Sequence, residues 1–437
     1  MKDNSIFQYV VLGAFIFFIV VGAIVFATYK SGSSTSKTQI SITLWGSIPQ
    51  NIFTPFVANY TRNLLGTDKF VVNYVEKDSS VLDADLVEAL ASGDGPDAIV
   101  LPQNLILRYL NKVYTVPFTT LPERTYLDTY AQISKKYLTS NGVLALPFQV
   151  DPLIMYWNRD TFSALGITKP PATWAEIIAL TTKVNKIDQN KNILETAVAL
   201  GEYQNINNAK EILSTMLLQL SNPIVSLDSG VAASTLSGSS LNKTSSAEQV
   251  LQYYTSFSNP TQTNYSWNRS LTSSLNAFAS GDLAVYFGLA SEYTKIRNKN
   301  PNLNFDVAMM PQVQDTKIKT TFGNIYGFAI LKSAKDPAST YSVISQLSSA
   351  DAVSSWPETY PFVSARNDVL GLSTANSAVK DVFNKSAIIA DTWLDPNSQQ
   401  TSNIFQEMVE SYTTSRATLD GAIGTADSEL GALLGNK

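Results

Sequence analysis

The side chains that could carry chemistry in this 437-residue chain are limited by the absence of both cysteine and histidine. Thiol nucleophiles, disulfides, Cys/His zinc sites and histidine general bases are therefore excluded. Carboxylates, amides, hydroxyls and aromatic rings remain. The most distinctive single group is Asp151, an acid between two apolar stretches, Val143 to Pro147 and Leu153 to Trp157. Because an isolated carboxylate is costly to bury, Asp151 needs either a partner or contact with solvent.

Two other patterns have the spacing of known chemical sites. Ser34 and Lys37 are spaced as in serine acyl-transfer enzymes, but the companion motifs are missing and we interpret the match as coincidence. Asp188, Asn190 and Asn192 alternate as in a calcium loop, but the glycine and the bidentate glutamate of such a loop are missing. We interpret this stretch as an Asx-rich turn. We expect neither a metal nor a cofactor.

The composition indicates a large exported protein. Its length exceeds what one hydrophobic core usually serves, so two lobes are expected. Hydrophobic residues make up 44% of the chain, and charged residues 15%, against about 25% in an average soluble protein. A net charge of -5 without a basic cluster argues against a nucleic-acid partner, because such binding requires neutralisation of phosphates.

The N-terminus contains one long uncharged segment, Tyr9–Tyr29. At about 1.5 Å per residue, a helix of this length would cross a hydrocarbon layer about 30 Å thick. The small residues within 25–27 could form a signal-peptidase site, but the length of the segment favours an uncleaved anchor. We predict a cytoplasmic N-terminus at residues 1–5, a transmembrane signal anchor at 6–29 and a linker at 30–38.

Alternating strand and helix patterns follow the linker. Strands are predicted at Ile40 to Trp45, Phe70 to Tyr74 and Ala98 to Leu101, with helical patterns between them. This order predicts parallel βαβ units, in which ligands bind at the carboxyl ends of the strands. Trp45 and Gln103 lie at two such ends.

The stretch from Asn141 to Glu176 has a specific order of elements. An apolar strand is followed by Asp151, a second apolar strand, a short helix that ends at Gly166, two prolines and a capping box. This order resembles the extracellular solute-binding proteins of ABC importers, in the large sugar-binding family that includes maltose-binding protein. The matching residues are Gly142, Leu146-Pro147, Asp151, Trp157-Asn158-Arg159-Asp160, Leu165-Gly166-Ile167, Pro170-Pro171 and Thr173-Trp174-Ala175-Glu176.

The resemblance extends from about Ile40 to the C-terminus. The run Phe278 to Val285 is similar to a family segment, although the tryptophan that usually follows it is replaced near Ser291 or Tyr293. The resemblance implies an α/β, two-lobed, periplasmic-binding-protein-like type II fold with hinge strands, here preceded by one transmembrane helix. The implied first lobe comprises 39–149 and 324–352, and the implied second lobe comprises 150–323 and 353–437.

The resemblance also implies a function. The chain would be a monomeric receptor that is held in the cell membrane by its single anchor. Its C-terminal body would be extracellular and would close over a solute, for which a sugar or oligosaccharide is expected. It would deliver this solute to the permease subunits of an ABC transporter. Aromatic rings can stack on sugars while amides and carboxylates bind hydroxyls. The expected ligand-binding residues are Trp45, Gln103, Asp151, Tyr203, Phe287, Tyr326 and Trp356, and the expected core tryptophans are Trp157, Trp174 and Trp393.

Two alternatives remain open. A membrane-anchored glycoside hydrolase needs only two suitably spaced carboxylates, although no pair is selected by the sequence. A sensor or adhesin without a transport role could use the same fold. The solute also remains open among carbohydrates, polyols, glycerol phosphates and peptides.

Overall fold

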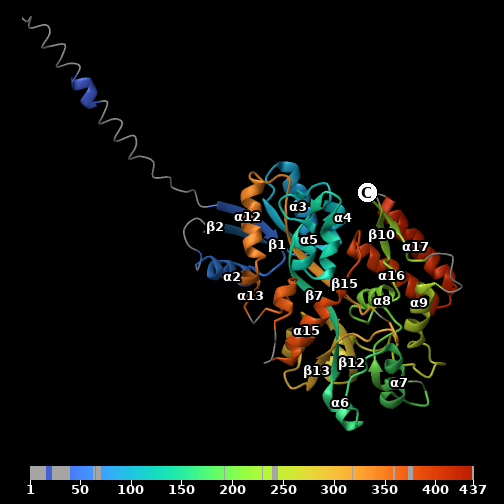
Figure 1. Cartoon of the computed structure of the whole chain (residues 1–437). Coiled ribbons are helices and arrows are strands. Elements are labelled where there is room, and N and C mark those ends of the chain that lie inside the picture. Colours follow the sequence, from blue (N-terminus) through green and yellow to red (C-terminus); the bar gives the residue numbers. More distant parts are fainter. Residues whose placement is uncertain are drawn as a thin grey trace, which may run out of the picture. The chain divides into compact units, whose positions relative to one another are not determined.

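A computed structural model describes residues 16–21, 40–62, 64, 70–190, 192–228, 230–238, 245–316, 318–357, 360–372 and 377–435. The chain divides into two units, Met1–Ser41 with Leu64–Val71, and Ile42–Asn63 with Val72–Lys437. Within the first unit, residues 16–21 are helical. The second unit, called the body below, contains the remaining elements of Figure 1, except that residues 40–41 and 70–71 of its first two strands belong to the first unit.

The predicted transmembrane helix, residues 6–29, falls outside the described residues except for 16–21. Among the helices that the structure describes, none combines the length and the apolar character needed to span a membrane.

The first lobe is built on strands in the order β2-β1-β3-β14-β7. Parallel pairing joins β1 to β3, whereas β14 is antiparallel to both β3 and β7. The strands of this lobe are β1 (Ile40–Gly46), β2 (Phe70–Glu76), β3 (Ala98–Pro102) and the short β4 (Val116–Pro117), β5 (Leu138–Thr139) and β6 (Gly142–Val143). Its helices are α2 (Gln50–Arg62), α3 (Leu82–Ser92), η2 (Gln103–Leu105), α4 (Ile106–Tyr109), α5 (Glu123–Thr129), η3 (Gln132–Tyr137), α12 (Pro337–Leu347), α13 (Ala350–Ser354) and α14 (Asn367–Leu370).

The second lobe continues the same sheet in the order β7-β12-β9-β8, with β13 also paired to β7. Its strands are β8 (Lys186–Ile187), β9 (Ile193–Val198), β10 (Val225–Asp228), β11 (Val231–Ser234), β12 (Leu283–Leu289), β13 (Phe305–Ala308) and β15 (Ala390–Asp391). Its helices are α6 (Arg159–Ala164), α7 (Trp174–Val184), α8 (Ala209–Gln219), α9 (Ser246–Ser256), α10 (Ser274–Ser280), α11 (Glu292–Lys299), α15 (Ala378–Ile388), α16 (Ser398–Thr413) and α17 (Leu419–Gly435).

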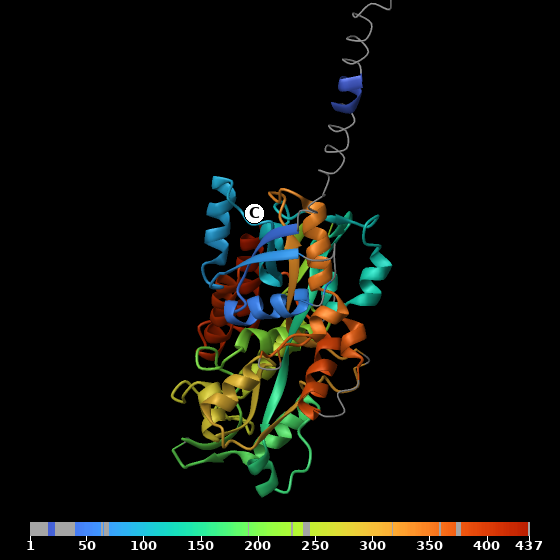
Figure 2. The same ribbon diagram turned by 90° about the vertical axis from the view of Figure 1, so that its left-hand side faces the viewer.

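Two long strands connect the lobes. β7 (Leu146–Asn158) pairs with β14 (Thr321–Ile330) as far as Pro152, and from Leu153 onward it pairs with β12 and β13. The course of β7 through the body can be followed in Figure 2. The sequence predicted two strands separated by a step at Asp151, and this detail was wrong. The strand is continuous because Asp151 and Pro152 are themselves opposite residues of β14.

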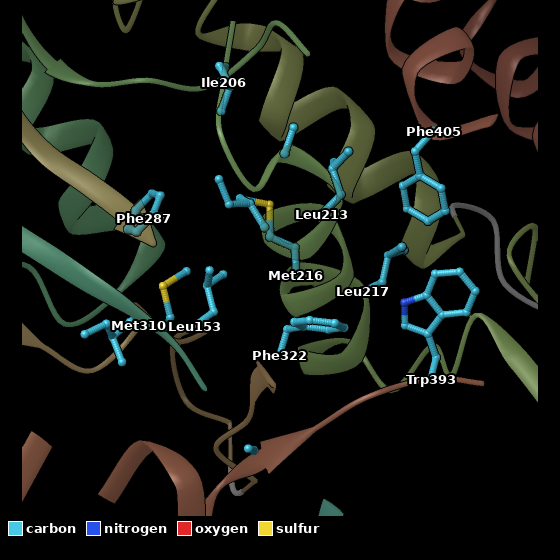
Figure 3. Packing of buried hydrophobic residues seen from close by; sticks show 14 of the residues in the cluster. Leu153, Ile206, Leu213, Met216, Leu217, Phe287, Met310, Phe322, Trp393 and Phe405 are labelled. Atoms are coloured by element: carbon cyan, nitrogen blue, oxygen red, sulfur yellow. The ribbon is translucent and has the colours of Figure 1, made fainter. Parts of the chain in front are cut away.

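The apolar core of the second lobe is centred on α8 (Figure 3). Leu213, Met216 and Leu217 are all buried on this helix, and Trp393 and Phe405 pack in the same cluster. Nearly every side chain of α8 is buried, including the charged Lys210. Because α8 is enclosed on most sides, its first turn is held firmly beside the polar site described below.

Several helix ends and turns have the structure that their local sequence favours. Gly166 follows α6 with a φ of 67°, the left-handed conformation that glycine adopts at little cost. Ser245 and Glu248 form a capping box at the start of α9. Asp188 accepts backbone hydrogen bonds from Asn190 and Asn192, both at 2.8 Å, and thus forms the expected Asx-rich turn.

Candidate functional site

A polar cleft lies between the two lobes of the body. Its larger part has a volume of about 860 Å³, and an adjoining part has a volume of about 250 Å³. Both parts are lined by first-lobe residues of α3 and η2 and by second-lobe residues of α8 and α16. The residues common to both parts are Ser79, Asn104, Leu105, Lys210, Glu211 and Ser398.

The first-lobe wall consists of residues that follow strands. Ser47 comes after β1, and Gln103 and Asn104 come directly after β3. The sequence predicted that ligand-facing residues would cluster at the carboxyl ends of these parallel strands, and the position of the cleft is consistent with that rule. In the larger part of the cleft, Asp83 and Arg108 form an ion pair at 2.9 Å.

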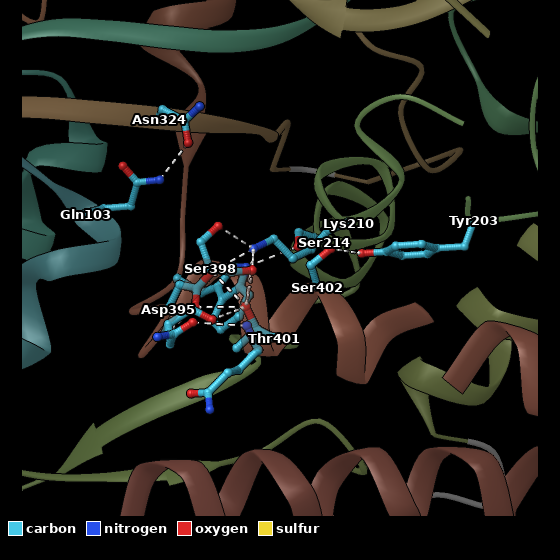
Figure 4. A network of polar contacts seen from close by, with 12 residues as sticks. Gln103, Tyr203, Lys210, Ser214, Asn324, Asp395, Ser398, Thr401 and Ser402 are labelled. Carbon is cyan, nitrogen blue, oxygen red and sulfur yellow. Dashed lines mark hydrogen bonds and ion pairs between the residues drawn. The ribbon is translucent and has the colours of Figure 1, made fainter. Parts of the chain in front are cut away.

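Lys210 is the centre of a buried polar network in the second-lobe wall (Figure 4). Its ammonium group lies 2.8 Å from Asp395 Oδ2 and donates to both oxygens of Ser398 and to Thr401 Oγ1 at 3.0–3.2 Å. Asp395 also accepts from Thr401 Oγ1 and from the backbone N–H of Asn397. Since both charges are almost completely buried, the pair depends on these additional hydrogen bonds. The network fixes the start of α16 against α8.

Glu211, the next residue along α8, lines both parts of the cleft. The neighbouring ammonium group of Lys210 is bound by Asp395, so Glu211 has no ion-pair partner among the described residues. Desolvation raises the pKa of the Glu211 carboxyl above its ordinary value, and the charge of Lys210 and a hydrogen bond from its own backbone only partly oppose this effect. Glu211 is thus a half-buried carboxylate at the cleft surface.

Two polar atoms in the cleft wall lack hydrogen-bond partners within the described part of the chain. They are Asn104 Oδ1 and Thr392 Oγ1, and both atoms are buried. Thr392 has no exposed surface at all. Asn104 borders both parts of the cleft and Thr392 borders the smaller part. Because buried polar atoms are nearly always paired, Asn104, which is partly exposed at the cleft, is suited to a molecule that enters it, whereas the fully buried Thr392 is out of reach.

Gln103 and Tyr326, two of the predicted ligand-binding residues, line the smaller part of the cleft. Gln103 is held by Asn324, whose side-chain oxygen accepts from Gln103 Nε2 at 2.6 Å, and by the backbone N–H of Ile325 at 3.1 Å. These bonds connect the end of β3 to the hinge strand β14. Gln103 therefore joins the first-lobe wall to the hinge as well as bordering the cavity.

Tyr203, another of the predicted ligand-binding residues, lines the larger part of the cleft. Its hydroxyl lies 2.9 Å from Ser402 Oγ, which orients the ring from α16 (Figure 4). A second aromatic residue, Trp393, borders the smaller part while being only 2% exposed, and its indole N–H donates to Ser214. Trp393 was expected to be a core residue, and its burial agrees with that, but it also contributes to the cleft wall.

Asp151 lies in the hinge strand β7, opposite Asn324, and lines neither part of the cleft. Its Oδ1 accepts from the backbone N–H of Ser291 at 2.9 Å. Burial raises the pKa of Asp151 to about 6, and the nearby charge of Glu292 adds to this increase. The partner that the sequence required for this acid is thus a backbone N–H at the start of α11.

The remaining predicted site residues also lie outside the two cavities. Trp45 carries the ammonium group of Lys77 over its ring at 4.2 Å. Phe287 packs edge-on to Trp174 in the core, with ring centroids 5.6 Å apart. Trp356 stacks on Phe56 of the first lobe, with ring centroids 4.3 Å apart. For these aromatic residues the structure favours packing over ligand contact.

The most prominent cleft residues, Lys210, Glu211 and Asp395, were not selected from the sequence. α8 was recognised by its apolar face, and its adjacent charges Lys210 and Glu211 were not interpreted. The useful signal was a charged pair in the first turn of a helix that is otherwise almost entirely apolar. Asp395 is distant in sequence, and nothing in the sequence indicates that it pairs with Lys210.

The described part of the chain contains no group of three or more carboxylates that could hold a metal ion. Of the cleft carboxylates, Asp83 and Asp395 are held in ion pairs, whereas Glu211 is not. The arrangement is therefore one that can bind a polar molecule through hydrogen bonds from both lobes.

Comparison with known protein families gives one match that covers most of the chain. The sequence profile of the family described as bacterial extracellular solute-binding protein matches residues 56–381. No curated protein matches the chain by sequence.

Several solved structures share the fold. A cyclo/maltodextrin-binding protein in complex with maltotetraose has a TM-score of 0.71 at 14% identity, over 91% of this chain and 98% of that chain. A cyclic alpha-maltosyl-1,6-maltose binding protein from Arthrobacter globiformis has a TM-score of 0.71 at 14% identity, over 91% and 100%. An ABC transporter solute-binding protein from Thermotoga lettingae, bound to alpha-D-tagatose, has a TM-score of 0.65 at 18% identity, over 91% and 100%. The predicted two-lobed α/β fold is confirmed by these similarities.

Proposed function

This chain belongs to the family of bacterial extracellular solute-binding proteins, and from that premise we propose that it is a carbohydrate receptor of an ABC importer. A sugar or oligosaccharide binds in the cleft between the lobes and is passed to permease subunits. The observation that carries the proposal is the cleft itself, which is lined by hydrogen-bonding side chains from both lobes. The larger part alone, about 860 Å³, falls within the range of about 300–1,000 Å³ that is typical of small-molecule pockets.

The proposed mechanism is closure of the lobes about β7 and β14. A solute that contacts both walls stabilises the closed state by the contacts that it makes only there. Tyr203 offers its ring to an apolar face of a sugar, and Asn104 and Glu211 offer acceptors for its hydroxyls. The hinge strands make this closure a rotation between two packed lobes.

The N-terminal segment completes the proposal. We infer that residues 6–29 anchor the receptor in the membrane with its body outside the cell, and that residues 30–38 link the anchor to the body. Tethering raises the effective concentration of the receptor at the permease. The absence of cysteine removes the residue that carries a lipid anchor in many such receptors, which supports an anchoring role for this segment.

The proposal is tested with the full chain, purified in a mild detergent. Thermal unfolding is measured against maltotetraose, mannobiose, tagatose, polyols and short peptides, and each compound is then recovered and checked for chemical change. A receptor stabilised by a sugar gains about 2.7 kcal/mol when the sugar is present at 100 times its Kd. Stabilisation by one unaltered sugar is expected. Stabilisation by peptides alone would contradict the carbohydrate assignment, and cleavage of the sugar would contradict the receptor assignment.

A further inference from the structure

The cleft has an excess of negative charge that the chain does not compensate. Asp83 and Arg108 neutralise each other at 2.9 Å, and Lys210 and Asp395 do so at 2.8 Å. These two pairs leave Glu211 as the unpaired charge among the residues that line the described cleft. An unpaired and partly desolvated carboxylate is costly, and a ligand that brings a positive charge would remove that cost.

A second carboxylate reinforces the negative field behind the same wall. Glu292 accepts hydrogen bonds from Tyr286 Oη at 2.5 Å and from Asn208 Nδ2 at 3.1 Å. Both hydrogen-bond partners are neutral. The charge of Lys295 also favours ionised Glu292, but burial outweighs these effects and raises the pKa of the carboxyl. Asn208 itself lines the larger part of the cleft, one helical turn before Glu211. The second-lobe wall thus presents hydrogen-bond acceptors to the ligand, and the carboxylates of Glu211 and Glu292 make this wall favourable for a cation.

One unpaired polar atom of the cleft points to the same kind of ligand. Asn104 Oδ1 can only accept a hydrogen bond, and it is buried without a partner in the described part of the chain. By contrast, the N–H groups of Lys210 are occupied by acceptors from α16 and the segment before it. The ligand that complements this wall is therefore rich in donors.

We propose that the solute bound in this cleft carries a protonated amine that pairs with Glu211, as in an amino sugar or an oligosaccharide that contains one. The inference rests on the proposed function and specifies its substrate class. An ammonium group has three N–H donors and one positive charge, so it satisfies Glu211 and can also donate to a neighbouring acceptor. A hydroxyl of the same solute supplies a donor to Asn104. Glu211 is accordingly the residue that determines specificity.

The test compares an amine-bearing disaccharide with neutral and acidic disaccharides. Binding of β-1,4-linked glucosamine disaccharide, its N-acetylated form, cellobiose and a galacturonate disaccharide is measured by calorimetry with the full chain in detergent at pH 7. The monosaccharides glucosamine and glucose form a second matched pair. We expect the amine-bearing sugar to bind on the order of tenfold to a hundredfold more tightly than its neutral partner, the range typical of hydrogen bonds to charged groups.

Two variants assign this preference to Glu211. Glu211→Gln keeps the shape of the side chain and one acceptor oxygen but removes the charge, and it is expected to abolish the preference for the amine-bearing sugar over its neutral partner. The control is Asp381→Asn, which removes an exposed carboxylate paired with Lys385 on α15, and it should leave the preference intact. Added salt should also reduce the preference in the unmodified chain, because the pair is only partly shielded from solvent.

These measurements distinguish failure of the amine inference from failure of the receptor proposal. Equal or tighter binding of the neutral sugars overturns the amine inference but leaves the receptor proposal standing. Retention of the preference in Glu211→Gln overturns the role of Glu211. If the chain binds none of these sugars but is stabilised by a peptide, the carbohydrate proposal and this inference both fail.

Discussion

The hinge residue Asp151 gives the most specific prediction for stability. Its ordinary pKa of 3.8 is raised to about 6 in the folded protein, mainly because it is buried. Between these two values the folded state binds more protons than the unfolded state. The free energy of unfolding therefore falls as the pH rises from about 4 to about 6. A difference of about two pH units corresponds to about 3 kcal/mol, since each unit is 1.36 kcal/mol.

Replacement of Asp151 by asparagine removes this effect while keeping the side-chain oxygen that accepts from Ser291 N. We expect Asp151→Asn to have nearly the stability of the unmodified chain at pH 4. At pH 7 to 8, where Asp151 is ionised, the variant should be more stable by about 3 kcal/mol. The expected stability difference needs little reduction for solvent screening because Asp151 is only 5% exposed.

The assay is urea unfolding of both proteins at pH 4, 5, 6, 7 and 8, followed by fluorescence and circular dichroism. The difference between the two proteins isolates Asp151 from other groups, such as Glu211 and Glu292, whose raised pKa values act in the same direction. A difference that does not change with pH would refute the argument. So would a variant that is less stable at pH 8 than at pH 4 relative to the unmodified chain, because ionised Asp151 would then be a net stabiliser.

Three further variants test the packing and the site. Lys210→Met should lower the free energy of unfolding by about 3–5 kcal/mol, because it leaves Asp395 buried and unpaired, and urea unfolding measures this. Gly201→Ala should cost about 1–3 kcal/mol in the same assay, because φ is +98° and the added Cβ would lie 2.5 Å from a backbone nitrogen. Phe287→Ala should cost about 3–5 kcal/mol but leave the solute Kd of the folded protein unchanged in calorimetry, because this ring lies in the core.

Each of these variants has a matched control. Lys385→Met removes an exposed ion pair and should change stability by less than about 1 kcal/mol. Gly424→Ala lies in α17 with open space around the new Cβ and should stabilise by about 0.5–1 kcal/mol. Tyr203→Ala should weaken solute binding, unlike Phe287→Ala. Equal losses within any of these pairs, or a reversal of the binding effects, would contradict the assignments.

Much of the fold could be predicted because its signals are local. The alternation of strands and helices, the helix end at Gly166 and the capping box at Ser245 each depend on a few neighbouring residues. The first-lobe wall of the site was accessible for a related reason. Once parallel strands are expected, their carboxyl ends must meet at one edge, and this placed Gln103 in the cleft.

The choice among aromatic residues could not be made in this way. Tyr203, Phe287 and Trp356 were all expected at the cleft from the sequence, but of these three only Tyr203 borders it. Whether an aromatic ring faces a cavity or a neighbouring ring depends on elements that approach it from elsewhere in the chain. For Trp356, the neighbour is Phe56, about 300 residues earlier in the sequence.

The sequence by itself determined the chemical repertoire and the family of this protein, because composition and motif order are properties of the chain alone. Only the tertiary structure decided which charges are neutralised. Lys210 and Glu211 are adjacent, and the sequence does not show which of the two charges has a partner. Folding brings Asp395 to 2.8 Å from the lysine and leaves the glutamate at the cleft surface. Electrostatic energy depends on distance and burial, and for residues 185 positions apart both are set by the packing of α8 against α16.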